Sequence, residues 1–156
     1  MNEALQSALI ALGSGAVASA VTHVATRAKI RLDLAAEYDK ELQETRRSAY
    51  VLLWAMLEPL ARYGRERKTT HADLVDISNK TRTWYFHTGG IYLTQASREP
   101  YFHWKDLMQL VLDDPRYAGK PELEVNELDL QRIRAAASSL RTQLSDDIGT
   151  KRLSRI

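Results

Sequence analysis

The sequence predicts an all-α protein, with one long N-terminal helix followed by a compact antiparallel helical bundle. Only 7 glycines and 4 prolines occur in 156 residues, so helix breakers are few. No glycine or proline lies between residues 16 and 58, and apolar residues repeat there at heptad spacing. The chain has no cysteine, which excludes disulfides and cysteine-ligated metals. A net charge of +2 argues against a strongly basic nucleic-acid coat.

The first third of the long helix has the length of a membrane span. Residues 4–26 carry no charge, and as a helix they are about 34 Å long. Arg27, Lys29 and Arg31 follow directly, which by the positive-inside rule places the N-terminus outside and the rest of the chain in the cytoplasm. We therefore expect a transmembrane and oligomerisation helix over residues 1–27. Because large apolar residues are sparse in this run, a soluble helix buried against protein is the alternative.

One face of this helix carries small residues at regular spacing. Ala11, Gly15, Ser19 and His23 follow one another at i, i+4 positions. Small residues at this spacing let helix backbones approach closely in lipid. Self-association would also shelter the polar side chains of Ser19 and His23 from hydrocarbon. We therefore predict that these four residues form a contact between copies of the chain.

The long helix is expected to run from near residue 3 to about residue 62. It carries a heptad-like stripe that could pack against later helices or against a second chain. The stripe consists of Ala35, Tyr38, Leu42, Thr45, Ala49, Leu52 and Met56. Pro59 should bend or end the helix, because proline has no N–H to donate.

A basic turn follows the long helix. It contains Arg62, Arg65, Arg67 and Lys68. Such a cluster could contact an acidic partner or a phosphate, although a solvated loop between two helices explains the same charges more simply.

The next two helices have local start signals. Thr70 followed by Asp73 is the pattern of a capping box, in which each side chain accepts a hydrogen bond from the other residue's backbone N–H. Gly89-Gly90 is the expected C-terminal stop of that helix. Ser97 is the expected N-cap of the following one.

The last helix has the most regular amphipathic pattern in the chain. Asn126 is its expected N-cap, with Asp129 three residues later, and Gly149 should end it. Its apolar stripe is formed by Leu130, Ile133, Ala137, Leu140, Leu144 and Ile148. We assign the bundle to residues 28–150 and a basic tail to residues 151–156.

Aromatic residues gather around the second and third of these helices. They are Trp84, Tyr85, Phe86, Tyr92, Tyr101, Phe102 and Trp104. A platform that stacks nucleobases would interleave such rings with basic residues. Burial in the core of a small bundle explains the rings more simply, so we expect them in the core.

Two blocks of the sequence resemble a family of small uncharacterised bacterial proteins. The first block contains Trp84-Tyr85-Phe86, Gly89-Gly90-Ile91-Tyr92-Leu93, Ser97-Arg98 and Tyr101-Phe102. The second contains Leu140-Arg141-Thr142, Leu144 and Asp147-Ile148-Gly149-Thr150. Members of this family typically begin with one hydrophobic membrane helix and a basic flank, followed by a helical cytoplasmic region. The resemblance implies a location in the bacterial inner membrane, with a cytoplasmic location as the alternative, and it implies no activity.

No motif in the sequence indicates an enzyme. The 4 histidines are never i, i+4 partners, and neither an HExxH nor a GxSxG pattern occurs. The acidic pairs Asp113-Asp114 and Asp146-Asp147 lack the ligand spacing of a calcium loop. We therefore expect no catalytic residue, no cofactor and no metal site.

The sequence thus predicts a non-catalytic, membrane-anchored, self-associating protein that acts as a scaffold or membrane effector. Its expected partners are copies of itself and a lipid bilayer, whereas nucleic acid is not expected. A soluble homo-oligomeric interaction module is the alternative. The third hypothesis is a protein that binds nucleic acid or nucleotides through the basic turn at residues 62–68.

Overall fold

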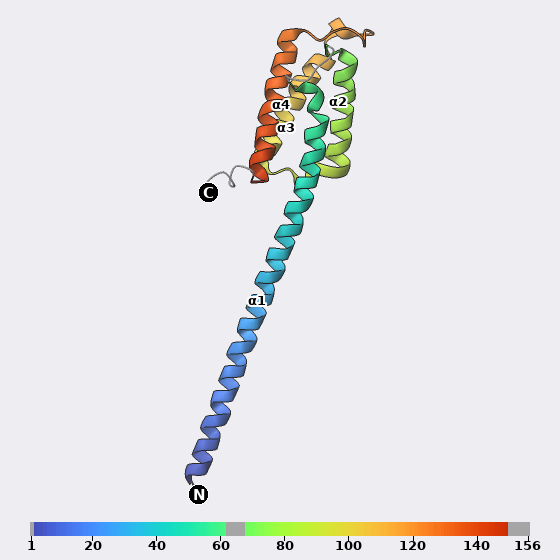
Figure 1. Ribbon diagram of the computed structural model, residues 1–156. Helices are drawn as coiled ribbons and strands as arrows, with labels where there is room; N and C mark the ends of the chain where they lie inside the picture. Colours follow the sequence, from blue (N-terminus) through green and yellow to red (C-terminus); the bar gives the residue numbers. More distant parts are fainter. Residues whose placement is uncertain (1, 62–67, 150–156) are drawn as a thin grey trace. The chain divides into compact units, whose positions relative to one another are not determined.

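The computed structural model shows a helical protein (Figure 1). The structure describes the backbone of residues 2–61 and 68–149, and within these ranges the side chains of residue 23, residues 26–61 and residues 68–149. Within the described backbone the chain forms four α-helices and no β-strand, which confirms the all-α prediction. The helices are α1 (Asn2–Met56), α2 (His71–Trp84), α3 (Gln95–Leu112) and α4 (Glu127–Asp147).

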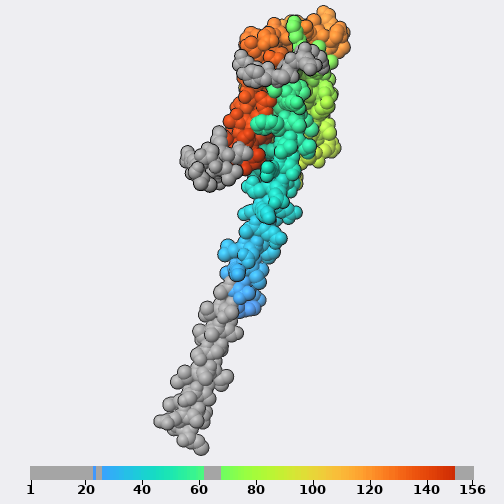
Figure 2. All heavy atoms as spheres, in the orientation of Figure 1, coloured from blue at the N-terminus to red at the C-terminus, as the bar shows by residue number. Residues whose placement is uncertain are grey.

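The chain divides into two compact units, and the division falls within α1. The first unit is Met1–Leu42 and the second is Gln43–Ile156. In the first unit, every side chain from residue 26 to residue 41 is exposed. In the second unit, the last turns of α1 lie between α4 and α2, as Figures 1 and 2 show.

The membrane-spanning helix expected over residues 1–27 is not supported. No helix in the part of the chain that the structure describes is both long enough and apolar enough to cross a bilayer. The composition of residues 4–26 gives the physical reason, because alanine, glycine, serine and threonine outnumber the large apolar residues there.

The bundle buries a different face of α1 from the predicted stripe. Tyr50 and Leu53 are fully buried, as is Leu57 just beyond the end of the helix. In the predicted stripe Ala49 is buried, but Leu52 is 49% exposed and Tyr38 is 67% exposed. Among the described residues, part of the heptad stripe is therefore exposed.

Helix α1 ends earlier than the predicted position near residue 62. It stops at Met56, and a 3-10 turn over Glu58–Leu60 contains Pro59. Leu60 is buried, so this turn still contributes to the core. The proline prediction is confirmed.

The N-terminus of α2 has the predicted capping box. The Thr70 hydroxyl accepts a hydrogen bond from the backbone N–H of Asp73 at 3.3 Å, and the Asp73 carboxylate accepts one from the backbone N–H of Thr70 at 2.8 Å. The carbonyl of Leu123 accepts a hydrogen bond from the backbone N–H of His71 at 2.9 Å, and the carbonyl of Pro121 accepts one from the backbone N–H of Ala72 at 2.8 Å. The long connection before α4 thus satisfies the donors that a helix start leaves free.

The glycine pair after α2 has a different role from the predicted one. A π-helical turn over Tyr85–Gly89 and a 3-10 turn over Gly90–Tyr92 continue the chain beyond Trp84. Neither glycine has a positive φ, so neither is a left-handed helix stop. A Cβ on Gly89 would instead lie 2.0 Å from Cζ2 of Trp84. The absence of a side chain lets the backbone pass directly over the indole ring.

The aromatic residues divide between core and surface. Trp84, Tyr101 and Trp104 are buried, and the indole N–H of Trp84 donates to the carbonyl of Ala49 in α1 at 3.0 Å. In contrast, Phe86 is 70% exposed. Phe102 is also exposed, at 42%. The prediction that these rings form the core is therefore confirmed for the three buried rings and wrong for Phe86 and Phe102.

Helix α4 follows its predicted pattern closely. Asn126 is the N-cap, and Gly149 adopts a φ of +79° just beyond the end of the helix. Asp129 does not complete a capping box, because its carboxylate accepts a hydrogen bond from Arg116 at 3.1 Å. The residues of the predicted stripe that are buried are Leu130, Ile133, Ala137, Leu140 and Leu144.

We predict that Gly89→Ala lowers the free energy of unfolding by about 3 kcal/mol, because the new methyl group would overlap the Trp84 ring. Gly119→Ala is the comparison, since Gly119 has a φ of +68° and open space around it. That change should lower the free energy by only about 1 kcal/mol. Urea unfolding of both variants measures the difference, and equal losses would contradict the packing role of Gly89.

Candidate functional site

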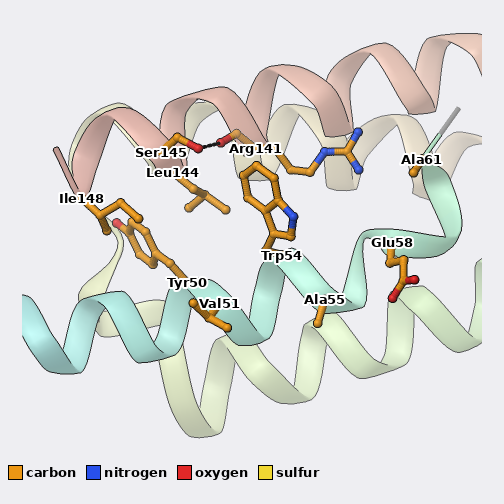
Figure 3. A pocket seen from close by; sticks show the side chains of 10 residues that line it. All are labelled: Tyr50, Val51, Trp54, Ala55, Glu58, Ala61, Arg141, Leu144, Ser145 and Ile148. Atoms are coloured by element: carbon orange, nitrogen blue, oxygen red, sulfur yellow. Dashed lines mark hydrogen bonds between the residues drawn. The ribbon is translucent and has the colours of Figure 1, made fainter. Parts of the chain in front are cut away.

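An apolar groove lies between the last turns of α1 and the last turns of α4 (Figure 3). Its volume is about 550 Å³. Most of its lining side chains are apolar, with one acidic and one basic residue among them. The lining includes Tyr50, Val51, Trp54, Ala55, Glu58, Arg141, Leu144 and Ile148.

The groove exposes large apolar side chains of α1. Val51 is 58% exposed and Trp54 is 46% exposed. The Trp54 ring stands between the two helices in Figure 3, beside the side chains of α4. An open groove with a half-exposed tryptophan is typical of a surface that contacts a partner.

Arg141 lies on the α4 wall of the groove. Its guanidinium carbon lies 5.9 Å from the centroid of the Trp54 ring, within range of a cation–π interaction. Its Nη1 also donates to the carbonyl of Leu57 at 3.4 Å. On the other wall, Glu58 is exposed. The groove therefore carries one charge of each sign.

A cluster of one carboxylate and three hydroxyl groups lies at the other end of the groove. Oδ2 of Asp147 accepts hydrogen bonds from the hydroxyls of Tyr50 at 3.0 Å, Thr94 at 2.6 Å and Ser97 at 2.5 Å. Oδ1 accepts a further hydrogen bond from the amide of Gln143 at 3.1 Å. One side chain at the end of α4 thus joins α1 and the start of α3.

This cluster explains why the predicted N-cap of α3 is wrong. Thr94, not Ser97, caps the helix, and its hydroxyl accepts the backbone N–H of Ser97 at 3.1 Å. The hydroxyl of Ser97 instead donates a hydrogen bond to the carboxylate of Asp147. The tertiary partner outcompetes the local cap that the sequence pattern predicts.

The pKa shifts in the cluster follow from its hydrogen bonds. Burial by itself raises the pKa of Asp147, but the donated hydrogen bonds outweigh burial and hold this pKa below the ordinary value. Burial, together with the negative charge of Asp147, raises the pKa of Tyr50. At neutral pH the cluster is therefore a carboxylate surrounded by protonated hydroxyls.

The cluster is suited to positioning helices rather than to a reaction. Ser97 is fully buried, so no substrate reaches its hydroxyl. Within the described ranges no group of three or more histidine or acidic side chains could hold a metal ion. The arrangement stabilises the geometry of the groove, whose lining includes Tyr50 and the residue after Asp147.

The predicted N-terminal contact residues lie on α1. Ala11, Gly15 and Ser19 belong to its helical backbone, and their side chains are outside the described residues. His23 is exposed. The basic residues Arg27, Lys29 and Arg31 are also exposed on α1.

The predicted basic turn is described only at its last residue. Arg62, Arg65 and Arg67 lie outside the described residues. The ammonium group of Lys68 forms an ion pair with Glu124 at 2.7 Å, and this contact raises the pKa of Lys68. This lysine therefore already has an acidic partner within the chain.

Sequence reasoning missed the groove residues. Val51 and Trp54 lie outside the predicted heptad-like stripe, and no motif singles them out. Once Tyr50, Leu53 and Leu57 are assigned to the core face by their 3- and 4-residue spacing, Val51 and Trp54 fall on a neighbouring face. That spacing is the signal by which the sequence could have indicated them.

No known protein family, curated protein or solved structure matches the sequence. The resemblance to small bacterial proteins therefore stays a prediction. The function has to be inferred from the chemistry of the described surfaces.

We predict that Asp147→Asn lowers the free energy of unfolding at neutral pH by about 2 kcal/mol, because charge-assisted hydrogen bonds to three hydroxyls are weakened. A lowered native pKa contributes stability above the unfolded value and loses it as the pH falls through the native value. The stability difference between the two proteins should therefore shrink below the ordinary aspartate pKa of 3.8.

Denaturant unfolding across a pH series measures this difference. Asp106→Asn, which removes an exposed carboxylate, is the control and should change stability little. A difference that is constant down to the lowest pH would contradict the role of the Asp147 charge.

Proposed function

We propose that the chain is a non-catalytic, self-associating helical protein that acts as a scaffold or effector through its assembly. The observation that carries the proposal is the uncovered segment of α1 over residues 26–41, in which every described side chain is exposed. A helix whose side chains are exposed is only marginally stable in water, because most helical stability in proteins comes from packing.

The uncovered segment has an apolar row on one face. Ile30, Leu34 and Tyr38 are 52%, 60% and 67% exposed. They follow at i, i+4 and i+8, so they lie one above another on the helix. Burying such a side chain fully contributes about 1.5–3 kcal/mol, and a second copy doubles the number of side chains that gain it.

The remaining residues of this segment are typical of a helix that pairs with another helix. Charges of both signs flank the apolar row, including Arg31 and Asp33. Mixed charges beside an apolar seam set the orientation and partner in coiled coils. The row and its flanking charges therefore support association with another helix of complementary pattern.

A lipid bilayer is the second candidate partner. The uncharged run over residues 4–26 and the exposed basic flank of Arg27, Lys29 and Arg31 favour it, since anionic headgroups attract such a flank. Membrane fractionation with an alkaline carbonate wash tests this candidate. The full chain should stay in the pellet while a chain that begins at Arg27 is released, and release of both would exclude a bilayer anchor.

We predict that Ile30→Glu combined with Leu34→Glu shifts the chain to the monomer mass, because the charges cannot be buried between copies. Light scattering over a concentration series measures the mass. Leu110→Glu is the matched control, since Leu110 is 71% exposed on α3 and belongs to neither the row nor the groove. A wild-type chain that is monomeric at every concentration would overturn the proposed function.

A further inference from the structure

We infer that the apolar row of one copy, Ile30, Leu34 and Tyr38, occupies the α1–α4 groove of a second copy. This inference rests on the proposed self-association and names the two surfaces that meet. It accounts for two exposed apolar features at once, the row on the uncovered segment and the open groove in the bundle.

The dimensions of the two surfaces agree. From Ile30 to Tyr38 the row extends over about 12 Å of helix axis. The α1 wall of the groove begins at Tyr50 and is extended to Glu58 by the 3-10 turn that follows the helix, which gives it about the same length. An amphipathic helix that places side chains at i, i+4 and i+8 into an apolar groove is a common recognition mode.

The charges of the two surfaces are complementary. Glu58 lies on the α1 wall of the groove and Arg141 lies on the α4 wall (Figure 3). On the uncovered segment, Arg31 and Asp33 lie on opposite sides of the row, because they follow Ile30 by one and three residues. With the Ile30 end of the row at the Glu58 end of the groove, Arg31 meets Glu58 and Asp33 meets Arg141.

The occupant is a second copy and not the same chain. The row and one wall of the groove belong to a single α-helix, α1. As long as α1 remains one helix between residues 38 and 50, the row can reach a groove only on another chain. A contact between two different surfaces closes into a dimer when it is reciprocal and otherwise continues into a longer assembly.

The cysteine-free sequence allows a direct test by disulfide cross-linking. Full-length Leu34→Cys is mixed with full-length Ala55→Cys that carries a size tag, and the mixture is oxidised mildly. Leu34 belongs to the row and Ala55 lines the groove. A disulfide needs Cα atoms within about 7 Å, so only a docked row brings the two cysteines together.

We predict that the mixed pair forms the cross-linked heterodimer. The control pair, Leu34→Cys with tagged Ala118→Cys, should not form it, because Ala118 is exposed in the connection before α4 and lies outside the groove. Both single variants are measured first by light scattering, to verify that they assemble as the wild-type chain does.

The outcomes separate this inference from the proposed function. Cross-linking only between two Leu34→Cys chains would mean that row pairs with row, which overturns the inference and retains self-association. An assembled protein without any cross-link to Ala55→Cys overturns the inference in the same way. A wild-type chain with the monomer mass at every concentration overturns both.

Discussion

The carboxylate of Asp147 joins three helices at one end of the bundle. It accepts hydroxyl hydrogen bonds from Tyr50 in α1 and from Thr94 and Ser97 at the start of α3, while it belongs to the last turn of α4. The position near the start of α3 is also favourable for a negative charge, because the helix dipole is positive there. Apolar burial supplies most of the stability of the bundle, but hydrophobic contacts are not directional. Because hydrogen bonds are directional, they fix how α1 lies against α4. They therefore maintain the width of the groove between these two helices.

Helix α1 combines two surfaces of different chemistry. Its last turns place Tyr50 and Leu53 in the core, and Leu57 is buried there just after the helix ends. The neighbouring face exposes Val51 and Trp54, and the uncovered segment exposes its own apolar row. Single exposed apolar residues are ordinary on a protein surface, whereas a continuous row and an apolar groove are features of contact surfaces. These features favour assembly over catalysis.

The sequence was sufficient wherever a structure is determined by residues close together in the chain. The capping box at Thr70, the N-cap at Asn126 and the left-handed glycine at position 149 are such local signals, and all three are confirmed. The sequence was not sufficient where a distant residue decides. Ser97 loses its predicted capping role to a carboxylate 50 residues away, and the role of Gly89 depends on the Trp84 ring. The spacing in α1 separates Val51 and Trp54 from the core face, but the packing of α4 decides that a groove lies beside them.

The central claim is that a second copy stabilises the uncovered segment of α1. Amide hydrogen exchange over residues 26–41, measured at several protein concentrations, tests it most directly, because exchange reports local opening of a helix. Association predicts that protection of these amides rises with protein concentration, while protection around the buried Trp104 stays constant. Rapid exchange of residues 26–41 at every concentration would contradict the claim.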